Sequence, residues 1–470
     1  MPNIAVAPMK NWISTLSGRF IGTTVYPLWT LRSHPTYLSY RRRFERQQYM
    51  SKQSLERLQL RQLQALVHYA YRYCPYYRMR MDRLNITPLD IRDLSDMQSL
   101  PVLTKSAIQD YGTDLLSRKI SENKRVPNRT GGSTGSPLHF WVDRERFDSR
   151  RASTDRHNAW AGLRPGDWYA HLWGAVLDTG GVSGVAKLGI REKLLYRSLL
   201  LNTSSITESD LQEFLALLRK YRPRHLLAYA QSAVFFAQYC QENAISDVHF
   251  DSIITTAEVL QEDQRTLLEE TFSAKVFNRY GCREVSVIAS ECEYHTGLHV
   301  NADALYVEIE EQPGLPLGYG RVLVTDMLNR SMPLIRYEIG DVATWAEDQS
   351  CPCGRNLPLL ATIEGRTTDF IYLPDGSGVS GPALTLVISS MTDIRQAQFV
   401  QKQDGSVLLY VIPRSGFSSE TILSLRKRLE PYLRNQVALD IRQVNEIQKE
   451  QSGKYRFVIS EQLRVLEKIS

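Results

Sequence analysis

The chain has 470 residues, of which 43% are hydrophobic and 23% charged, a composition typical of a soluble globular protein with two or three domains. It contains no run of about 18 apolar residues that would predict a membrane-spanning helix, and its N-terminus lacks the apolar core and cleavage site of a secretion signal. Six cysteines are too few to indicate a disulfide framework, so we expect a protein of the reducing cytosol.

The excess of positive charge lies in the first fifty residues. The net charge is +6, and residues 1–50 hold seven basic side chains and one acidic one (7 − 1 = +6), so the rest of the chain is neutral overall. This segment also carries the aromatic residues Trp12, Phe20, Tyr26, Trp29 and Tyr40. It is either an arm that rests on an anionic membrane face or a solvated arm that packs its aromatic side chains on the main domain. Nucleic acid is not an expected partner, because no binding module is recognisable.

Helices and strands alternate along the next part of the chain. Leucines at helical spacing predict a helix over residues 53–73, and a strand is expected at 137–143. A capping box of Thr207 and Asp210 starts a helix at 211–221. The pattern then predicts strands at 225–230, 250–258 and 274–281, separated by helices that end near residues 240 and 272. Such alternation indicates a parallel sheet with crossover helices.

The last part of the chain has a different character. Residues 303–345 are mostly β, and a strand pair with a turn at Asp404-Gly405, a helix and a further strand follow. We therefore expect an α/β fold with four parts: a basic arm (1–50), a large N-terminal domain with mixed and parallel sheets (51–364), a linker (365–370) and a small α+β domain (371–470).

The stretch NRTGGSTGSP, residues 128–137, resembles a phosphate-binding loop in composition. A Walker loop or dinucleotide fingerprint would be followed by a helix, whereas a strand follows here, so this loop is expected to cap a hairpin. The lysine of a Walker loop is also missing, since Ser136 and Pro137 stand there. The turn still offers backbone N–H groups and the hydroxyls of Thr130, Ser133 and Thr134, which can surround a polyphosphate; equally, it can be an ordinary loop.

Four further segments carry charged residues at expected strand ends, at the domain boundary or near the end of the chain. Glu284 follows a strand that ends in Tyr280-Gly281, and Asp341 is expected at a strand end after Arg336. Arg366 lies at the domain boundary, and Lys454 lies on a small-residue turn near the end of the chain. Taken alone, each residue has an equally good explanation: Glu284 as a surface carboxylate, Asp341 as a turn residue, Arg366 as a salt-bridge partner and Lys454 as a tail lysine. Their order and spacing carry the interpretation.

In that order, the motifs resemble those of the adenylate-forming superfamily, which includes acyl-CoA synthetases and peptide-synthetase adenylation domains. The likeness is greatest to the phenylacetate–CoA ligase family, in the branch found with capsular polysaccharide biosynthesis. It covers nearly the whole chain and begins at LQALVHYAYRYCPYYR, residues 63–78. The resemblance implies an ATP- and Mg²⁺-dependent, AMP-forming ligase with a mobile C-terminal domain. Such an enzyme activates a carboxylic acid as its acyl-adenylate and passes the acyl group to CoA.

The resemblance also implies roles for individual residues. The phosphate loop corresponds to Thr130, Gly131, Gly132, Ser133, Thr134 and Gly135. The adenine and ribose contacts correspond to Ala257, Glu258, Tyr280, Gly281, Asp341 and Arg366. Glu284 corresponds to the Mg²⁺-associated carboxylate, Lys454 to the catalytic lysine of the C-terminal domain, and Thr368 or Asp369 to its hinge. Two positions depart from the family pattern: Ser136 replaces a lysine, and Arg283 replaces a threonine that contacts the α-phosphate.

Simple electrostatics supports a mobile lysine. A carboxylate and an α-phosphate are both anions, and at about 4 Å in partly dry surroundings they repel each other by several kcal/mol. Cations must therefore bridge them, and the glycine loop supplies only neutral dipoles. Mg²⁺ at Glu284, the Arg283 side chain and an incoming Lys454 can supply the charge. A lysine on a separate domain can then withdraw to admit the second substrate.

Cysteines and histidines gather in two segments. Cys292 and His299 lie in ECEYHTGLH, and Cys351 and Cys353 follow in CPCGR. Three thiols and one imidazole would make a structural zinc site; the alternative is reduced thiols on two loops with solvated histidines. His299 is preferred to His295 because Gly-Leu-His is the piece that resembles the family.

The acyl pocket is less well specified by the sequence. His171, Trp173 and Tyr229 are candidates for its wall and suit an aromatic or medium-sized acid, but they are equally well explained as core residues. Two rivals to a CoA ligase remain open. One is transfer of the acyl group to an amine, sugar or carrier protein, and the other is a non-catalytic nucleotide-binding relative. A homodimer and peripheral contact with the inner membrane face are compatible with the sequence.

Overall fold

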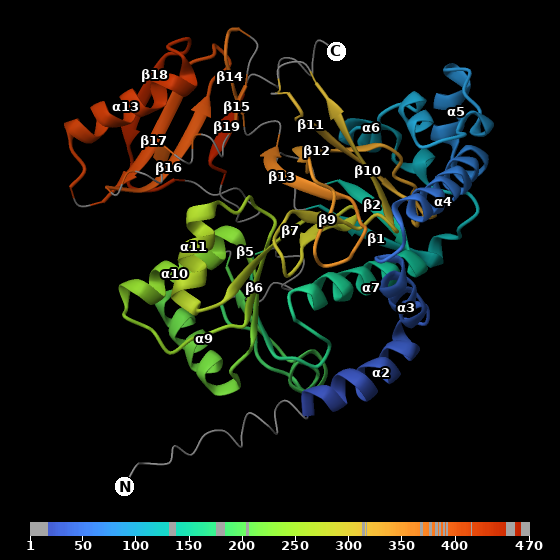
Figure 1. Cartoon of the computed structure of the whole chain (residues 1–470), viewed down its shortest axis with the longest axis horizontal. Helices are drawn as coiled ribbons and strands as arrows, with labels where there is room; N and C mark the ends of the chain where they lie inside the picture. Colours follow the sequence, from blue (N-terminus) through green and yellow to red (C-terminus); the bar gives the residue numbers. More distant parts are fainter. Residues whose placement is uncertain are drawn as a thin grey trace.

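The computed structural model of the protein describes residues 17–130, 138–174, 184–203, 206–312, 317–366, 370–375, 378–380, 393–414, 416–447 and 456–461, with the single positions 315, 384, 387, 388 and 391. The expected α/β fold is confirmed. One large mixed sheet is flanked by helices, and the C-terminal part builds a small sheet of its own (Figure 1). Within these ranges, no helix combines the length and the apolar character needed to cross a bilayer.

The N-terminal helices lie against helix α7 (Arg144–Trp160). They are α2 (Tyr26–Ser33) and α3 (Tyr37–Gln47), and the π-helical turn η1 (Ile21–Val25) leads into α2. The hydroxyl of Tyr37 donates to Asp155 of α7 at 2.5 Å, and Tyr26 donates to the same carboxylate at 3.3 Å. Tyr26 and Tyr40 are buried, whereas Phe20 is 62% exposed. The N-terminal segment is therefore fixed on the main domain by one face of its helices.

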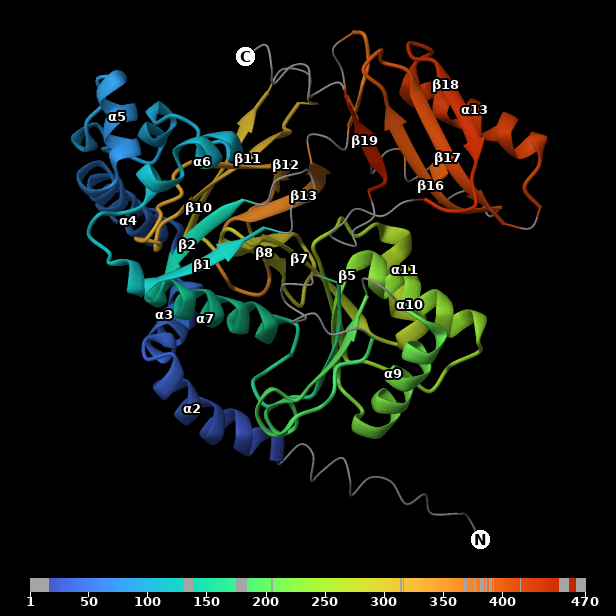
Figure 2. The same cartoon turned by 180° about the vertical axis from the view of Figure 1, so that it is seen from behind.

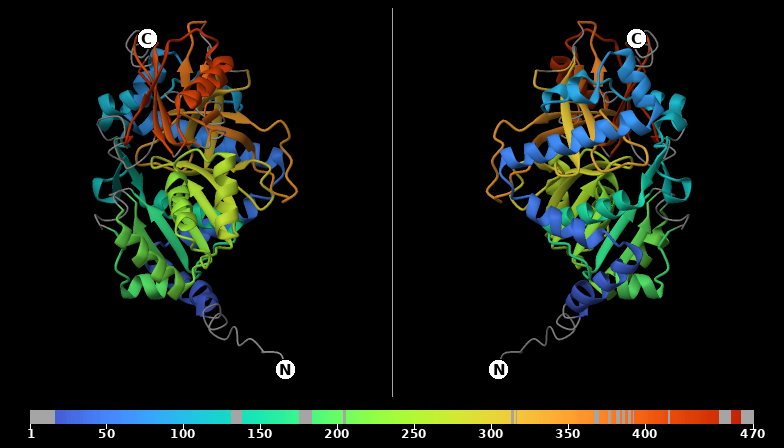
Figure 3. Two further views of the ribbon diagram at one scale, coloured as in Figure 1. Left: turned by 90° about the vertical axis from the view of Figure 1, so that its left-hand side faces the viewer. Right: turned by 90° about the vertical axis from the view of Figure 1, so that its right-hand side faces the viewer.

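A second helical layer covers the antiparallel end of the large sheet. The predicted helix at 53–73 is confirmed as α4 (Lys52–Tyr73), and it begins where the side chain of Ser51 accepts from the backbone N–H of Ser54. Its buried leucines, among them Leu55 and Leu63, form one stripe. Figure 3 shows this blue helix across the yellow and orange strands. The layer also contains α5 (Pro75–Arg83), α6 (Lys105–Tyr111) and the short 3-10 helices Pro88–Asp90, Ser95–Ser99, Gly112–Leu115 and Glu122–Lys124.

The large sheet has the strand order β10-β11-β12-β13-β9-β8-β7-β6-β5-β3-β4. Its parallel half is β3 (Tyr169–Trp173), β4 (Ser198–Asn202), β5 (His225–Tyr229), β6 (Ser252–Thr256) and β7 (Lys275–Cys282). The crossover helices are α9 (Glu208–Tyr221), α10 (Ala230–Glu242) and α11 (Glu262–Phe272), which lie side by side in Figure 2. The capping box of Thr207 and Asp210 is present, so the local signals placed this half correctly.

The other half of the sheet is antiparallel. It contains β8 (Ser286–Glu291), β9 (Leu298–Val300), β10 (Leu305–Glu311), β11 (Gly320–Asp326), β12 (Tyr337–Trp345) and β13 (Leu359–Arg366). One expectation was wrong: Asp341 does not end a strand but lies in the middle of β12, opposite Arg366 of β13. Gly340 has a positive φ of 90°, and the register shifts after Val342, so a bend lies inside a continuous strand where the sequence suggested an end.

The C-terminal part has a separate core. Its sheet has the order β18-β17-β16-β19, with β16 (Ile394–Gln401), β17 (Val407–Pro413), β18 (Leu439–Gln443) and β19 (Val458–Ser460). Helix α13 (Ser419–Leu433) packs Leu425 and Leu429 onto it. The predicted hairpin, helix and strand are all present. A short pair, β14 (Phe370–Tyr372) and β15 (Gly378–Ser380), precedes them.

Candidate active site and metal centre

The glycine-rich loop connects the two strands of a hairpin, as expected. Strand β1 (Arg125–Arg129) pairs antiparallel with β2 (His139–Asp143). The Thr130 N–H donates to the Leu138 carbonyl at 3.0 Å, and the Leu138 N–H donates to the Thr130 hydroxyl at 2.9 Å. The Thr130 side chain therefore helps to close the hairpin. The other predicted phosphate ligands, Gly131, Gly132, Ser133, Thr134 and Gly135, lie outside the described residues.

Glu284 lies in the turn between β7 and β8. Its carboxylate accepts a hydrogen bond of 3.0 Å from the Tyr337 hydroxyl, and the side chain is half-buried. Tyr337 begins β12, the strand that also carries Asp341. Burial, followed by the charge of Glu284, raises the pKa of Tyr337, so the hydroxyl keeps its proton and remains a donor to Glu284.

Two buried arginines of α7 hold the backbone of this turn. Arg150 donates to the carbonyl oxygens of Arg283, at 3.3 Å, and Glu284. Arg146 donates to the Val285 carbonyl at 3.3 Å and pairs with the buried Asp326 at 2.8 Å. Burial and the nearby Arg146 lower the pKa of Arg150 to about 10, because both disfavour its positive charge. The geometry of the turn thus depends on charged side chains beneath it.

The sequence reasoning missed Tyr337 and these α7 residues. The charged pattern of RERFDSRRASTDRHNAW would have predicted a solvated helix, although Arg146, Arg150 and Arg156 are buried in it. The usable signal was the number of arginines in one helix.

Tyr280 and Asp341 come together from different strands. The Tyr280 hydroxyl donates to the Asp341 carboxylate at 2.7 Å, and the backbone of Asp341 faces that of Arg366. Gly281 is closely approached: a Cβ there would lie 2.6 Å from the Ser286 carbonyl oxygen. The predicted ribose-contacting residues therefore come from β12 and β13, which are adjacent in the sheet, and from β7, which lies beyond β9 and β8.

Ala257 and Glu258 directly follow strand β6. Ala257 has a positive φ of 70°, a left-handed conformation that a non-glycine residue rarely adopts. The Glu258 carboxylate accepts from the Gln231 N–H at 2.9 Å, at the first turn of α10, where the helix dipole favours negative charge. The chain thus turns sharply at the end of the strand predicted to line the adenine pocket.

The three acyl-pocket candidates form a row of rings. His171 and Trp173 lie on β3 with ring centroids 4.7 Å apart, and Trp173 lies 4.3 Å from Tyr229 at the end of β5. Tyr229, like Ala257, is at the carboxyl end of a parallel strand. In open α/β sheets, this edge is where ligands bind.

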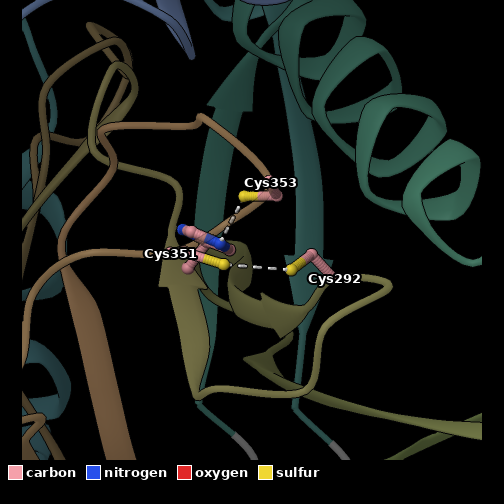
Figure 4. Close-up of side chains that lie close together, drawn as sticks. Cys292, Cys351 and Cys353 are labelled. Carbon is pink, nitrogen blue, oxygen red and sulfur yellow. Dashed lines mark hydrogen bonds between the residues drawn. The ribbon is translucent and has the colours of Figure 1, made fainter.

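The four predicted metal ligands form one cluster. The sulfur and imidazole nitrogen atoms of Cys292, His299, Cys351 and Cys353 all lie within 4.8 Å of one another (Figure 4). Cys292 Sγ lies 3.6 Å from Cys351 Sγ, and Cys353 Sγ lies 3.3 Å from His299 Nε2. Ligands about 2.3 Å from one tetrahedral zinc ion are separated by about 3.8 Å, so the spacing fits that ion. His295 is engaged elsewhere, 3.2 Å from Glu291.

Burial disfavours the charged forms of the two most buried members of this cluster. It raises the pKa of Cys292 to about 12 and lowers the pKa of His299 to about 4. The His299 Nδ1 atom lies 3.3 Å from the Leu357 carbonyl, which orients Nε2 toward Cys353. A set of three sulfurs, one buried and two half-buried, together with one buried and oriented nitrogen is chemically suited to a thiophilic divalent ion.

Lys454 and the hinge residues Thr368 and Asp369 lie outside the described residues. The strand β19 begins four residues after Lys454 and pairs parallel with β16. Only the backbone of Arg366 can be described.

Comparison with known proteins identifies relatives of this chain. A profile of the CapK C-terminal domain matches residues 371–461. A phenylacetate–coenzyme A ligase of Thermus thermophilus is 26% identical over 372 residues, covering 76% of this chain and 80% of that protein. The CapK protein of Staphylococcus aureus is 22% identical, covering 86% of this chain and 88% of its own length.

A solved structure shows the same fold over most of the chain. It is a 2-hydroxyisobutyryl-CoA ligase in the postadenylation state, with a TM-score of 0.73, 19% identity and coverage of 90% of this chain and 94% of that one. For the same ligase in the thioesterification state the TM-score is 0.57. The chain is thus a homologue of the phenylacetate–CoA ligase and CapK proteins and has the fold of the adenylate-forming CoA ligases.

Proposed function

We propose that the protein is an ATP-dependent, AMP-forming ligase that activates a carboxylic acid as an acyl-adenylate and transfers the acyl group to CoA. The observation that carries this proposal is that strand β12 meets two residues of the β7–β8 region: its Asp341 accepts from the Tyr280 hydroxyl, and its Tyr337 donates to Glu284. Their order along the chain is that of the family motifs which the sequence resembles. The named activities of the phenylacetate–CoA ligase relatives support the same reaction.

In the first step, an oxygen of the carboxylic acid forms a bond to the α-phosphorus of ATP, and pyrophosphate leaves. Asp341, oriented by Tyr280, binds the ribose hydroxyls together with Arg366. The turn of Thr130 to Gly135 surrounds the β- and γ-phosphates with N–H groups and hydroxyls. Arg283 contacts the α-phosphate in this proposal. Its guanidinium is suited to that role because it can donate two parallel hydrogen bonds to phosphate oxygens.

Glu284 is the residue that would hold Mg²⁺. Tyr337 orients its carboxylate from one side and the Arg150 guanidinium holds its backbone from below, so the oxygen atoms have a defined direction. When bound, Mg²⁺ supplies positive charge against the phosphate oxygens.

In the second step, the CoA sulfur bonds to the acyl carbon and AMP leaves. The C-terminal domain, residues 371–470, is proposed to turn about Thr368 or Asp369 between the steps. Lys454 completes the adenylation site and then withdraws. The two scores against one ligase, 0.73 and 0.57, fit an arrangement nearer to its postadenylation state.

The acid is proposed to contact His171, Trp173 and Tyr229, whose rings can stack on an aromatic or medium-sized acyl group. Hydroxylamine trapping of the activated acyl group, screened across aliphatic and aromatic acids, identifies the substrate. Glu284→Gln is the matched control and is expected to abolish trapping. If no acid in the panel gives a trapped product although the protein binds ATP, a non-catalytic relative is favoured. The departures Ser136 and Arg283 from the family pattern are the reason to test this alternative.

Product mass with CoA present distinguishes a thioester from transfer to an amine, sugar or carrier protein. The basic N-terminal segment favours such a transfer, since an acceptor linked to a membrane lies next to anionic lipids that attract basic side chains. The proposal places the enzyme in the cytoplasm with peripheral contact to the inner membrane face through residues 1–50. A homodimer is compatible with it and is measured by light scattering.

We also propose a structural zinc ion at Cys292, His299, Cys351 and Cys353. The ion would tie the β8–β9 hairpin to the loop that precedes β13, the strand of Arg366. Metal analysis of the purified protein is expected to give about one equivalent of zinc. Less than half an equivalent, after purification without chelators, would contradict the site.

A further inference from the structure

The helical segment over residues 17–33 presents an apolar outer face. Phe20, Leu28 and Leu31 are 62%, 64% and 49% exposed. They are separated by eight and three residues, which places them on one side of a helix. Large apolar side chains scattered singly on a surface are common, but these three share one side of one helix, and we refer to them as the stripe.

The opposite face of this helix is fixed, so the stripe cannot turn inward. Gly22 lies so close to the main domain that a Cβ would come 1.9 Å from the Pro165 carbonyl oxygen. The Trp29 ring meets the Tyr196 ring edge-on at 5.7 Å, and the Arg151 guanidinium lies 5.3 Å from the Trp29 ring. These contacts direct the stripe toward solvent.

A second segment extends the apolar surface. Ile190 and Leu194 are 79% and 61% exposed, and they flank the start of η6 (Glu192–Tyr196). This turn contacts η1, and Arg197 donates to the Ser17 hydroxyl at 3.3 Å. The two exposed segments, far apart in sequence, thus lie next to each other. We call Phe20, Leu28, Leu31, Ile190 and Leu194 the basal patch.

Basic side chains border the basal patch. Arg19 and Arg32, at the two ends of the helical stripe, are exposed, and so are Lys187, Arg191 and Lys193 beside Ile190 and Leu194. Acidic residues are scarce: residues 1–44 contain none, and Glu192 is the only one in the range 184–203. Apolar side chains surrounded by cations are the composition of surfaces that lie in the interface of an anionic bilayer.

We propose that the basal patch docks the protein on the surface of a bilayer that contains anionic lipids. The apolar side chains enter the acyl boundary and the surrounding cations contact the headgroups. A bilayer is favoured over a protein partner because the charge around the patch is predominantly positive, whereas a protein interface would require a matching acidic surface. This docking rests on the peripheral membrane contact proposed above and assigns residues to it, but it does not depend on the proposed ligase reaction.

The position of the patch suits such a role. Helix α2 and the C-terminal sheet lie at opposite ends of the molecule in every view (Figures 1, 2 and 3). Docking through α2 therefore leaves the C-terminal domain away from the lipid surface, where its proposed rotation is unobstructed.

Flotation of the full chain with vesicles tests the proposal. Vesicles of phosphatidylcholine alone are compared with vesicles that also contain phosphatidylglycerol. The wild type is expected to float with the anionic vesicles and much less with the neutral ones, and added salt is expected to release it. The combined substitution Phe20→Gln, Leu28→Gln and Leu31→Gln is expected to weaken binding by about tenfold or more.

Ile190→Gln with Leu194→Gln separates the second segment from the first and is expected to weaken binding as well. Leu423→Gln is the matched control, because Leu423 is 67% exposed on α13 in the C-terminal part. Its binding should equal that of the wild type. Circular dichroism of each variant serves as the control for folding.

Two results would overturn the proposal. The first is an absence of flotation with anionic vesicles at low salt. The second is a wild-type dimer that the helix substitutions convert to monomer without changing vesicle binding, because the basal patch would then be an interface between copies of the chain.

Discussion

Replacement of Arg150 by methionine separates positioning of Glu284 from overall stability. The guanidinium donates to two carbonyls of the turn, and each hydrogen bond from a charged donor contributes about 1.5–3 kcal/mol. The buried charge is itself unfavourable: the fall of its pKa to about 10 corresponds to about 3 kcal/mol. These effects largely offset each other, so Arg150→Met is expected to change the free energy of unfolding by only about 0–3 kcal/mol.

The expected effect on catalysis is larger. Without the guanidinium, the turn loses the group that holds its carbonyls, and a displacement of about 1 Å at Glu284 can slow the reaction about 100-fold. Arg146 still pairs with Asp326 at 2.8 Å, so no buried carboxylate is left unpaired. We expect a fall in kcat for ATP–pyrophosphate exchange, with a raised Mg²⁺ requirement.

A neighbouring residue provides the control. Arg151 is the same residue type on the same helix, but it faces Tyr26 and Trp29 in the N-terminal segment. Arg151→Met should lower the unfolding temperature and leave exchange within about threefold of the wild type. If Arg150→Met also retains exchange within about threefold at an unchanged Mg²⁺ requirement, the positioning role is wrong.

Four other perturbations have defined outcomes. Lys454→Ala should abolish exchange but spare thioester formation from supplied acyl-adenylate; equal loss of both half-reactions contradicts a lysine that acts in one arrangement only. Tyr280→Phe removes the 2.7 Å hydrogen bond to Asp341 and should raise the KM for ATP about fivefold to tenfold with little change in kcat, and an unchanged KM would exclude an orienting role. Cys353→Ser should lower the bound zinc and the unfolding temperature together, whereas wild-type stability with zinc absent would make the cluster incidental. Burial, opposed by a nearby carboxylate, lowers the pKa of His225 to about 4. The neutral imidazole therefore contributes about 3 kcal/mol to the free energy of unfolding above pH 6.5, and this contribution is lost as the pH falls toward 4. His225→Asn should flatten that part of the stability profile, and chemical denaturation across this pH range measures it.

The order of helices and strands could be predicted from the sequence because local free energy determines it. The capping box at Thr207, the leucine spacing of α4 and the turn at Asp404-Gly405 act within a few residues of the chain. The same holds for the hairpin that carries the glycine-rich loop, since a strand rather than a helix follows it. The motif order, read without any contact, was also enough to suggest the reaction class.

The tertiary structure alone decided which of these residues meet. Tyr337 reaches Glu284, and Arg150 reaches the turn across more than a hundred residues, because the sheet and α7 bring distant segments together. No periodicity in a local window encodes such contacts. The exposure of Phe20 likewise depends on the close approach of Gly22 to Pro165. That contact determines which face of the helix packs on the main domain, and Phe20 lies on another face.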